Sequence, residues 1–147
     1  ASLAAARRTA LSALARVSPT TLLEDATVPR SMLAETFSLI ERLTKKYALT
    51  VGTFGHAGDG NLHPTVLCDE RDADEMKRAH AFYDELYEQV LAWGGTVSGE
   101  HGIGIAKKEY LARQIGPGGV AVMKRIKLAF DPEGILNPGK IFADGQE

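Results

Sequence analysis

Two short stretches of the chain carry the residue types best suited to chemistry. The first is FGHAGDGNLH at 54–63 and the second is SGEHGIG at 98–104. Together they hold three of the four histidines and the carboxylate of Glu100, set among glycines that let the backbone approach a ligand closely. Two neutral imidazoles and one carboxylate make a three-ligand metal set, which leaves coordination positions open for water or substrate. We therefore predict that both stretches belong to one metal site.

A β-hairpin is the element expected to position the first stretch. The runs on either side of Ala57–Gly60 are short, partly alternating and rich in β-branched residues, which predicts a hairpin with a four-residue loop. That register places His56 opposite Asn61, and Phe54 opposite His63. Opposed residues and alternate residues point to the same face of a sheet. The polar, open face should therefore carry His56, Asn61, His63 and Thr65, and the core-facing side Val51, Leu62 and Val66.

Glu100 is the expected third metal ligand. It follows the short strand-like segment Gly95–Ser98, and in extended backbone its neighbour His101 projects to the other side. The carboxylate would then reach the metal, and His101 would stay available for proton transfer. The alternative is that these histidines are surface residues, or core residues with hydrogen-bond partners, and that they bind no metal.

Three stretches resemble the signature sequences of the C-terminal domain of FAD-linked 2-hydroxy-acid oxidoreductases. They are GHAGDGNLH at 55–63, GEHGIG at 99–104 and LNPGKIF at 136–142. This group includes the FAD-linked component of glycolate oxidase, FAD-dependent D-lactate dehydrogenase and D-2-hydroxyglutarate dehydrogenase, within the vanillyl-alcohol-oxidase type of flavoprotein. The resemblance extends from about Leu3 to Phe142 and so covers nearly the whole chain.

The resemblance implies an enzyme that oxidises a D-2-hydroxy acid, such as glycolate or D-lactate, to the 2-oxo acid. His56, His63 and Glu100 would bind a divalent metal, for which zinc, manganese and iron are all suitable. His101 would remove the hydroxyl proton, and FAD would accept the hydride. This is chemically reasonable, because a Lewis acid lowers the pKa of a hydroxyl group and an imidazole titrates near neutral pH.

The resemblance also implies contacts outside the metal site. An arginine near the chain start grips the substrate carboxylate in such enzymes, and Arg7, in the predicted helix Ser2–Val17, matches it best. Arg8 is the second choice, and the alternative is that both are solvated helix charges. The other implied contacts are Asn61 and Thr65 for the substrate, and Asn137 and Lys140 for the flavin.

The sequence offers no recognisable FAD-binding motif. No Gly-x-Gly-x-x-Gly fingerprint follows a predicted strand, and related enzymes carry FAD on a separate N-terminal domain. Ala1 is not an initiator methionine. We therefore expect residues 1–147 to be a single domain, the C-terminal fragment of a longer chain, and inactive alone. Its expected partners are the N-terminal FAD-binding domain, a small 2-hydroxy acid, and an electron-acceptor protein or quinone.

Composition excludes several classes of protein. The 147 residues are 44% hydrophobic and 24% charged, as in an ordinary globular domain. A formal net charge of −2 gives no electrostatic basis for nucleic-acid binding, and no apolar run approaches the roughly 18 residues of a membrane span. The single cysteine, Cys68, rules out an internal disulfide and is expected to be buried. We expect a cytoplasmic protein that reaches a membrane only through partner subunits.

The order of predicted elements indicates an α+β fold, with an antiparallel sheet and helices packed on one face, as the cap domain of a two-domain flavoprotein. A strand is predicted over Thr20–Val28, a helix capped by Ser31, and a long helix opened by Asp72. Phe37 is assigned to the core and Lys107 to solvent. Gly116–Gly119 should break the chain before a last helix at Val120–Phe130.

Two other classes of function remain open. Two histidines and a glutamate also bind zinc in hydrolases, so the chain could be a self-standing metallohydrolase. It could also be a metal-stabilised interaction module without chemistry. The His-Glu-x-x-His signal of many zinc hydrolases is absent, and a histidine directly beside a metal ligand favours proton transfer over a purely structural site.

Overall fold

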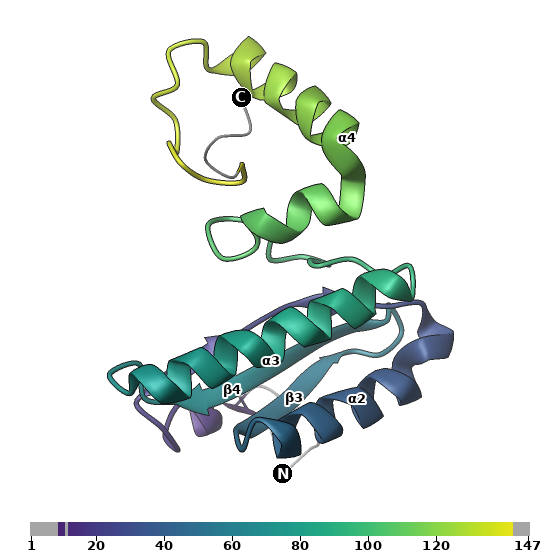
Figure 1. Cartoon of the computed structure of the whole chain (residues 1–147), viewed down its shortest axis with the longest axis vertical. Helices are drawn as coiled ribbons and strands as arrows, with labels where there is room; N and C mark the ends of the chain where they lie inside the picture. The colour runs from purple at the N-terminus through teal and green to yellow at the C-terminus, as the bar shows by residue number, and fades with distance from the viewer. Residues whose placement is uncertain (1–8, 11, 143–147) are drawn as a thin grey trace.

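The computed structural model describes residues 9–10 and 12–142, in which an antiparallel sheet carries two helices on one face (Figure 1). The central strand is β4 (Asn61–Cys68). Strand β3 (Thr50–His56) pairs with one edge of β4, and β1 (Thr20–Leu23) and β2 (Ala26–Thr27) pair in succession with the other edge. The predicted α+β class, antiparallel sheet and helix placement are confirmed.

The predicted strand Thr20–Val28 is divided into β1 and β2, with Glu24 and Asp25 between them. The interruption has a chemical cause in the central strand. The Glu24 amide donates to the Pro64 carbonyl at 3.2 Å, but proline has no N–H to return the second bond of the pair. The pairing register is the same before and after the break, so the chain passes straight along the edge of β4.

The first described long helix, α2 (Leu33–Lys46), follows a short 3₁₀ turn, η1 (Arg30–Met32). Met32 is the N-cap of α2, so the predicted cap at Ser31 is wrong. Phe37 is 47% exposed, which corrects its assignment to the core. The buried stripe contains Thr36, and the next residue is rotated by about 100° around the helix axis, toward solvent.

Helix α3 (Ala73–Ala92) begins as the sequence predicts. The Asp72 carboxylate accepts hydrogen bonds from the amides of Asp74 and Glu75, both at 3.0 Å, and so caps two free N–H groups. The helix ends before Gly94, whose φ of 76° suits glycine. It supplies the largest share of the hydrophobic core, through Ala79, Phe82, Tyr83, Leu86, Tyr87 and Val90.

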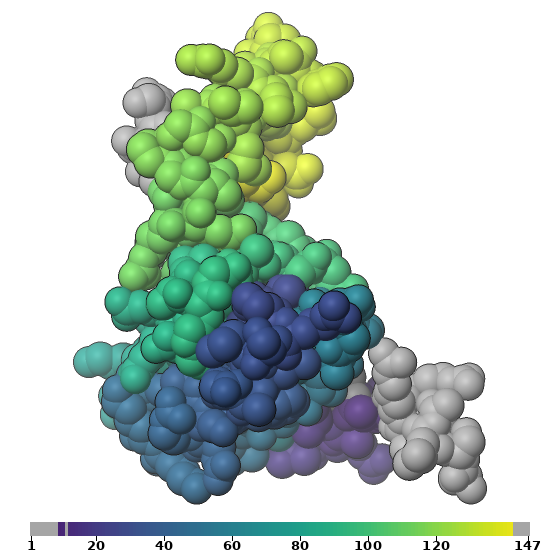
Figure 2. Space-filling view, turned by 90° about the vertical axis from the view of Figure 1, so that its right-hand side faces the viewer, coloured from purple at the N-terminus to yellow at the C-terminus, as the bar shows by residue number. Residues whose placement is uncertain are grey.

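Helix α4 (Lys108–Phe130) is kinked at Gly116, where φ is 71° and ψ is 168°. The predicted break is confirmed, although the helix resumes directly after Gly116 and not at Val120. The part beyond the kink and the segment 131–142 project from the body of sheet and helices (Figures 1 and 2). We call this projection the C-terminal arm, residues 117–142. In the described part of the chain, no helix is both long and apolar enough to cross a membrane.

Lys107 lies inside the molecule and is 4% exposed, so its assignment to solvent is wrong. Its Nζ donates to the Asp25 carbonyl at 3.0 Å and lies 3.1 Å from Glu24 Oε2. The Tyr87 hydroxyl donates to the same carboxylate oxygen at 2.7 Å. This buried network joins the β1–β2 interruption to α3 and to the start of α4.

Lys107→Met is expected to destabilise the intact protein by roughly 3 kcal/mol, because it leaves the Glu24 carboxylate without its buried cation. Chemical denaturation would measure the change in unfolding free energy. Lys77→Met, at an exposed position of α3, is the matched control and should change stability by less than about 0.5 kcal/mol. Equal unfolding midpoints for the two variants would show that the network does not stabilise the fold.

Candidate metal centre

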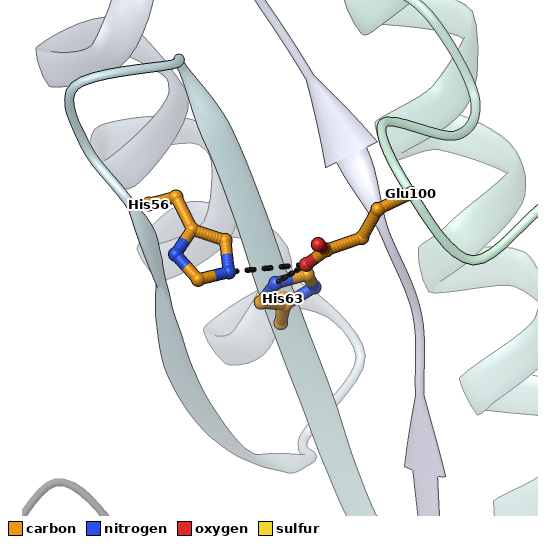
Figure 3. A group of neighbouring side chains, drawn as sticks. All are labelled: His56, His63 and Glu100. Carbon is orange, nitrogen blue, oxygen red and sulfur yellow. Dashed lines mark hydrogen bonds and ion pairs between the residues drawn. The ribbon is translucent and has the colours of Figure 1, made fainter.

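Three donor atoms from three parts of the chain converge over one face of the sheet (Figure 3). His56 ends β3, His63 lies in β4, and Glu100 belongs to the connection between α3 and α4. The Nε2 atoms of both histidines lie 3.1 Å from Glu100 Oε1. The register opposes His56 to Asn61 and Phe54 to His63, which confirms the predicted hairpin pairing.

The distance from Glu100 to each histidine suits ligands of a single cation. Zinc binds imidazole nitrogen and carboxylate oxygen at about 2.0–2.2 Å, so two ligands of one ion lie about 3.0–3.5 Å apart. The two contacts of 3.1 Å fall in that range. Burial lowers the pKa of His63, and the neighbouring His101 lowers it further, so the ring is neutral and can offer a lone pair. The set is therefore suited to zinc, manganese or iron.

The three donors differ in their exposure to solvent. The His63 side chain is 4% exposed, whereas those of His56 and Glu100 are 38% and 50% exposed. The hairpin face was expected to be open, but Asn61 and Thr65 are buried together with His63. The connection that carries Glu100 lies over this face, as the close approach of Gly99 to the Asn61 side chain shows. The centre thus has a buried floor and an accessible rim.

Asp25 fixes the connection that carries Glu100. Its buried Oδ2 accepts hydrogen bonds from the Ser98 hydroxyl at 2.8 Å and from the amides of Gly99, Glu100 and His101 at 2.9, 2.9 and 2.8 Å. Burial alone would raise the pKa of the Asp25 carboxyl. The hydrogen bonds outweigh burial and hold the pKa below its usual value, so this buried group is a carboxylate at neutral pH.

Sequence reasoning missed the role of Asp25. The available signal was a carboxylate in the middle of an apolar, strand-like run, where a charge needs a partner. Position 99 has no room for a side chain, because a Cβ atom there would lie 2.3 Å from Thr27 Oγ1 and 2.8 Å from Asn61 Cγ. The strand predicted at Gly95–Ser98 is reduced to a single bridge between Thr96 and Thr27.

His101 lies beside the donor set. Its ring stacks on the His63 ring, with centroids 4.8 Å apart and planes inclined by 9°. The residue is exposed, whereas the ring it covers is buried. Both neighbours therefore approach His63, Glu100 at Nε2 and His101 on the ring face. The grouped donor atoms belong to His56, His63 and Glu100, and the role of His101 stays a prediction.

The other predicted site residues are not all brought to this centre. Arg7 lies outside the described residues. Asn61 is buried opposite His56 and, within the described chain, its Oδ1 has no hydrogen-bond partner. Thr65 is fully buried, and its hydroxyl donates to the His63 carbonyl at 3.3 Å.

Asn137 and Lys140 are exposed on the C-terminal arm. One contact links their segment to the metal centre. The Ile141 amide donates to the Gly104 carbonyl at 2.8 Å, and Gly104 follows His101 by three residues. The arm therefore meets the end of the connection that carries Glu100 and His101.

Comparison of the sequence with known proteins places this chain in a family. The family model described as FAD linked oxidases, C-terminal domain, matches residues 1–141. The glycolate oxidase subunit GlcD of Bacillus subtilis is 54% identical over 138 residues, which cover 94% of this chain and 29% of that protein. GlcD of Escherichia coli K12 is 40% identical over 136 residues, or 92% and 27% of the two chains.

A D-lactate dehydrogenase of Anaerostipes hadrus is 42% identical over 118 residues, which are 80% of this chain and 25% of that protein. The chain thus spans less than a third of the length of these relatives. The family match nevertheless covers nearly every residue, including both histidine-bearing stretches and the C-terminal arm up to Ile141. The chain belongs to the family of FAD linked oxidases, as a C-terminal domain of that family.

Proposed function

We propose that this chain is the substrate- and metal-binding part of an FAD-dependent enzyme that oxidises a D-2-hydroxy acid to the 2-oxo acid. The observation that carries the proposal is the convergence of His56 Nε2, His63 Nε2 and Glu100 Oε1, with the His101 ring stacked beside them. Relatives named as a glycolate oxidase subunit and a D-lactate dehydrogenase support substrates such as glycolate and D-lactate.

The proposed oxidation removes a proton and a hydride from the substrate. A divalent cation held by His56, His63 and Glu100 would act as a Lewis acid and lower the pKa of the substrate hydroxyl. His101 accepts the hydroxyl proton on a ring nitrogen, because it is exposed and adjacent to the donors. FAD, when bound, would supply the acceptor for the hydride from the hydroxyl-bearing carbon, and a protein or quinone would take up the electrons. The 2-oxo acid is the product.

Polar groups near the centre are proposed to orient the substrate. Asn61 lies on the face of His56 and His63, and its Oδ1, which has no partner among the described residues, would accept a hydrogen bond there. Arg7 is proposed to bind the substrate carboxylate through its two-pronged guanidinium group. Thr65 remains a predicted contact, although its hydroxyl already donates to the His63 carbonyl.

The C-terminal arm is proposed to pack against an FAD-binding domain and to bring Asn137 and Lys140 to the flavin. Its large apolar side chains are unusually exposed for a folded chain. They are Val122, Ile126, Leu128, Phe130, Ile135, Leu136 and Ile141. The family description, a C-terminal domain of oxidases linked to FAD, supplies the chemical nature of the partner.

The test is an anaerobic titration of the intact protein with glycolate, D-lactate and D-2-hydroxyglutarate. Substrate should bleach the flavin absorbance, removal of the metal by a chelator should prevent bleaching, and added zinc or manganese should restore it. L-Lactate is the stereochemical control. Bleaching that persists after metal analysis shows an empty site would reject the metal-assisted mechanism. A protein without flavin, or without response to any acid, would reject the proposed activity.

A further inference from the structure

Asp25 and His63 form an unusual buried pair beside the metal centre. Asp25 Oδ1 lies 4.0 Å from His63 Nδ1, and the two side chains are 0% and 4% exposed. Within the described part of the chain, neither atom has a hydrogen-bond partner. Leaving polar atoms buried in this way costs free energy, so a pair that persists in the fold needs a compensating reason.

The two oxygens of Asp25 face different parts of the centre. Oδ2 holds the amides of Gly99, Glu100 and His101, and Oδ1 faces His63. The backbone explains how one residue reaches both. Asp25 lies in the interruption between β1 and β2, and the pairings on either side of the break place it across from His63 in β4.

The negative charge of Asp25 favours one tautomer of a neutral imidazole over the other. A neutral histidine carries its proton on either Nδ1 or Nε2 and has a lone pair on the other nitrogen. A proton on Nδ1 would face the carboxylate favourably, whereas a lone pair on Nδ1 would be repelled. The separation of 4.0 Å is too long for a hydrogen bond, so the preference arises from charge acting through a water-poor interior.

Glu100 Oε1, 3.1 Å from Nε2, has the opposite effect while no cation lies between them, because its charge favours a proton on Nε2. A bound cation would neutralise that carboxylate, and the preference set by Asp25 would then leave Nε2 with the lone pair that a metal ligand needs. Metal-binding histidines generally have the second nitrogen oriented by an outer carboxylate or carbonyl. We propose that Asp25 is a positioning residue that selects the Nδ1-protonated form of His63 while it fixes the connection carrying Glu100 and His101. This role of Asp25 rests on the metal site proposed above, because orienting Nε2 serves a purpose only if that site binds a metal.

Asp25→Asn separates tautomer selection from simple anchoring of the connection. The single amide oxygen of asparagine can accept the hydrogen bonds that Oδ2 accepts. The opposite orientation is unfavourable, because it would place the NH₂ group against N–H and O–H donors. The NH₂ group must then face His63 Nδ1 and favour a lone pair there. Anchoring is retained in this variant, and the preferred form of His63 is reversed. Asp74→Asn, at an exposed position of α3, is the matched control.

The experiment uses the intact protein in a Glu100→Ala background, which removes the opposing charge at Nε2. The protein carries ¹⁵N-labelled histidine and is freed of metal at pH 8, and long-range ¹H–¹⁵N spectra are assigned with a His63 variant. In this background the parent and Asp74→Asn should show His63 protonated on Nδ1, and Asp25→Asn should show it protonated on Nε2. With Glu100 restored, zinc titration should give an affinity about 10–100-fold weaker for Asp25→Asn than for Asp74→Asn.

The possible outcomes are distinct. Retention of the Nδ1 proton in Asp25→Asn would overturn the proposal, even if the variant unfolds more easily, because a lower unfolding midpoint reports anchoring alone. If Asp25→Asn does not fold, a Glu100→Ala parent with the proton on Nε2 would overturn the proposal, and one with the proton on Nδ1 would support it. A wild type that binds no zinc, together with the expected change of tautomer in the Glu100→Ala background, would reject the proposed metal function and leave the positioning role intact.

Discussion

His63→Asn in the intact protein is expected to lower metal affinity by more than about 100-fold, beyond the loss typical of outer positions. The substitution removes Nε2, which lies 3.1 Å from Glu100 Oε1, and leaves two donors for the cation. The asparagine amide stays beside Asp25, so the buried carboxylate still faces a polar group. Without a bound Lewis acid, flavin reduction by the substrate should slow by roughly 10³-fold.

Two measurements would check this expectation. Elemental mass spectrometry gives the metal content of the purified protein, and anaerobic mixing with substrate gives the rate of flavin reduction. His80→Asn is the matched control, because His80 is exposed on α3 and lies away from both histidine-bearing stretches. The control should keep full metal content and rate. Undiminished metal in His63→Asn would remove His63 from the ligand set, and an undiminished rate with lost metal would remove the metal from the reaction.

His101→Ala is expected to keep the metal and to lose about 10²- to 10⁴-fold in kcat, the usual contribution of a general base. The ring stacks on His63 at 4.8 Å and lies outside the grouped donor atoms, so its removal leaves the ligands in place. The backbone amide of His101, which donates to Asp25, is unchanged by the substitution. The loss should therefore be chemical and not conformational.

Rescue by added imidazole offers a sharp readout for this variant. The position is exposed, so a free imidazole can occupy the space of the missing ring and restore part of the rate. His80→Ala in the same buffer controls for general effects of imidazole. A near-wild-type rate in His101→Ala without imidazole would end the assignment of His101 as the base. Loss of bound metal would instead make it a ligand.

The hairpin at the centre of the site was determined by local sequence. Its four-residue loop, rich in glycine, and its β-branched flanks act within a span of about 15 residues, and they predict the opposition of His56 to Asn61. The cap at Asp72 and the kink at Gly116 are similarly local, since one side chain or one φ angle decides each.

Only the tertiary structure decided how Glu100 reaches that hairpin. The residue types marked it as a ligand, but its backbone is held by Asp25, which lies 75 residues earlier in the sequence. A buried carboxylate that binds successive amides leaves no periodic pattern in the sequence, because its partners are backbone groups present at almost every position. Asp25 was therefore overlooked, although it connects the two halves of the centre.

The errors at Phe37 and Lys107 have the same origin. Helical spacing identifies an apolar stripe but cannot say where its centre lies, and the packing of α2 on the core turned Phe37 to solvent. Lys107 is buried because Glu24, the Asp25 carbonyl and the Tyr87 ring surround its charge. The sequence by itself determined the hairpin and the residue types of the site. Tertiary contacts decided which of them meet, because burial and charge pairing depend on neighbours that are distant along the chain.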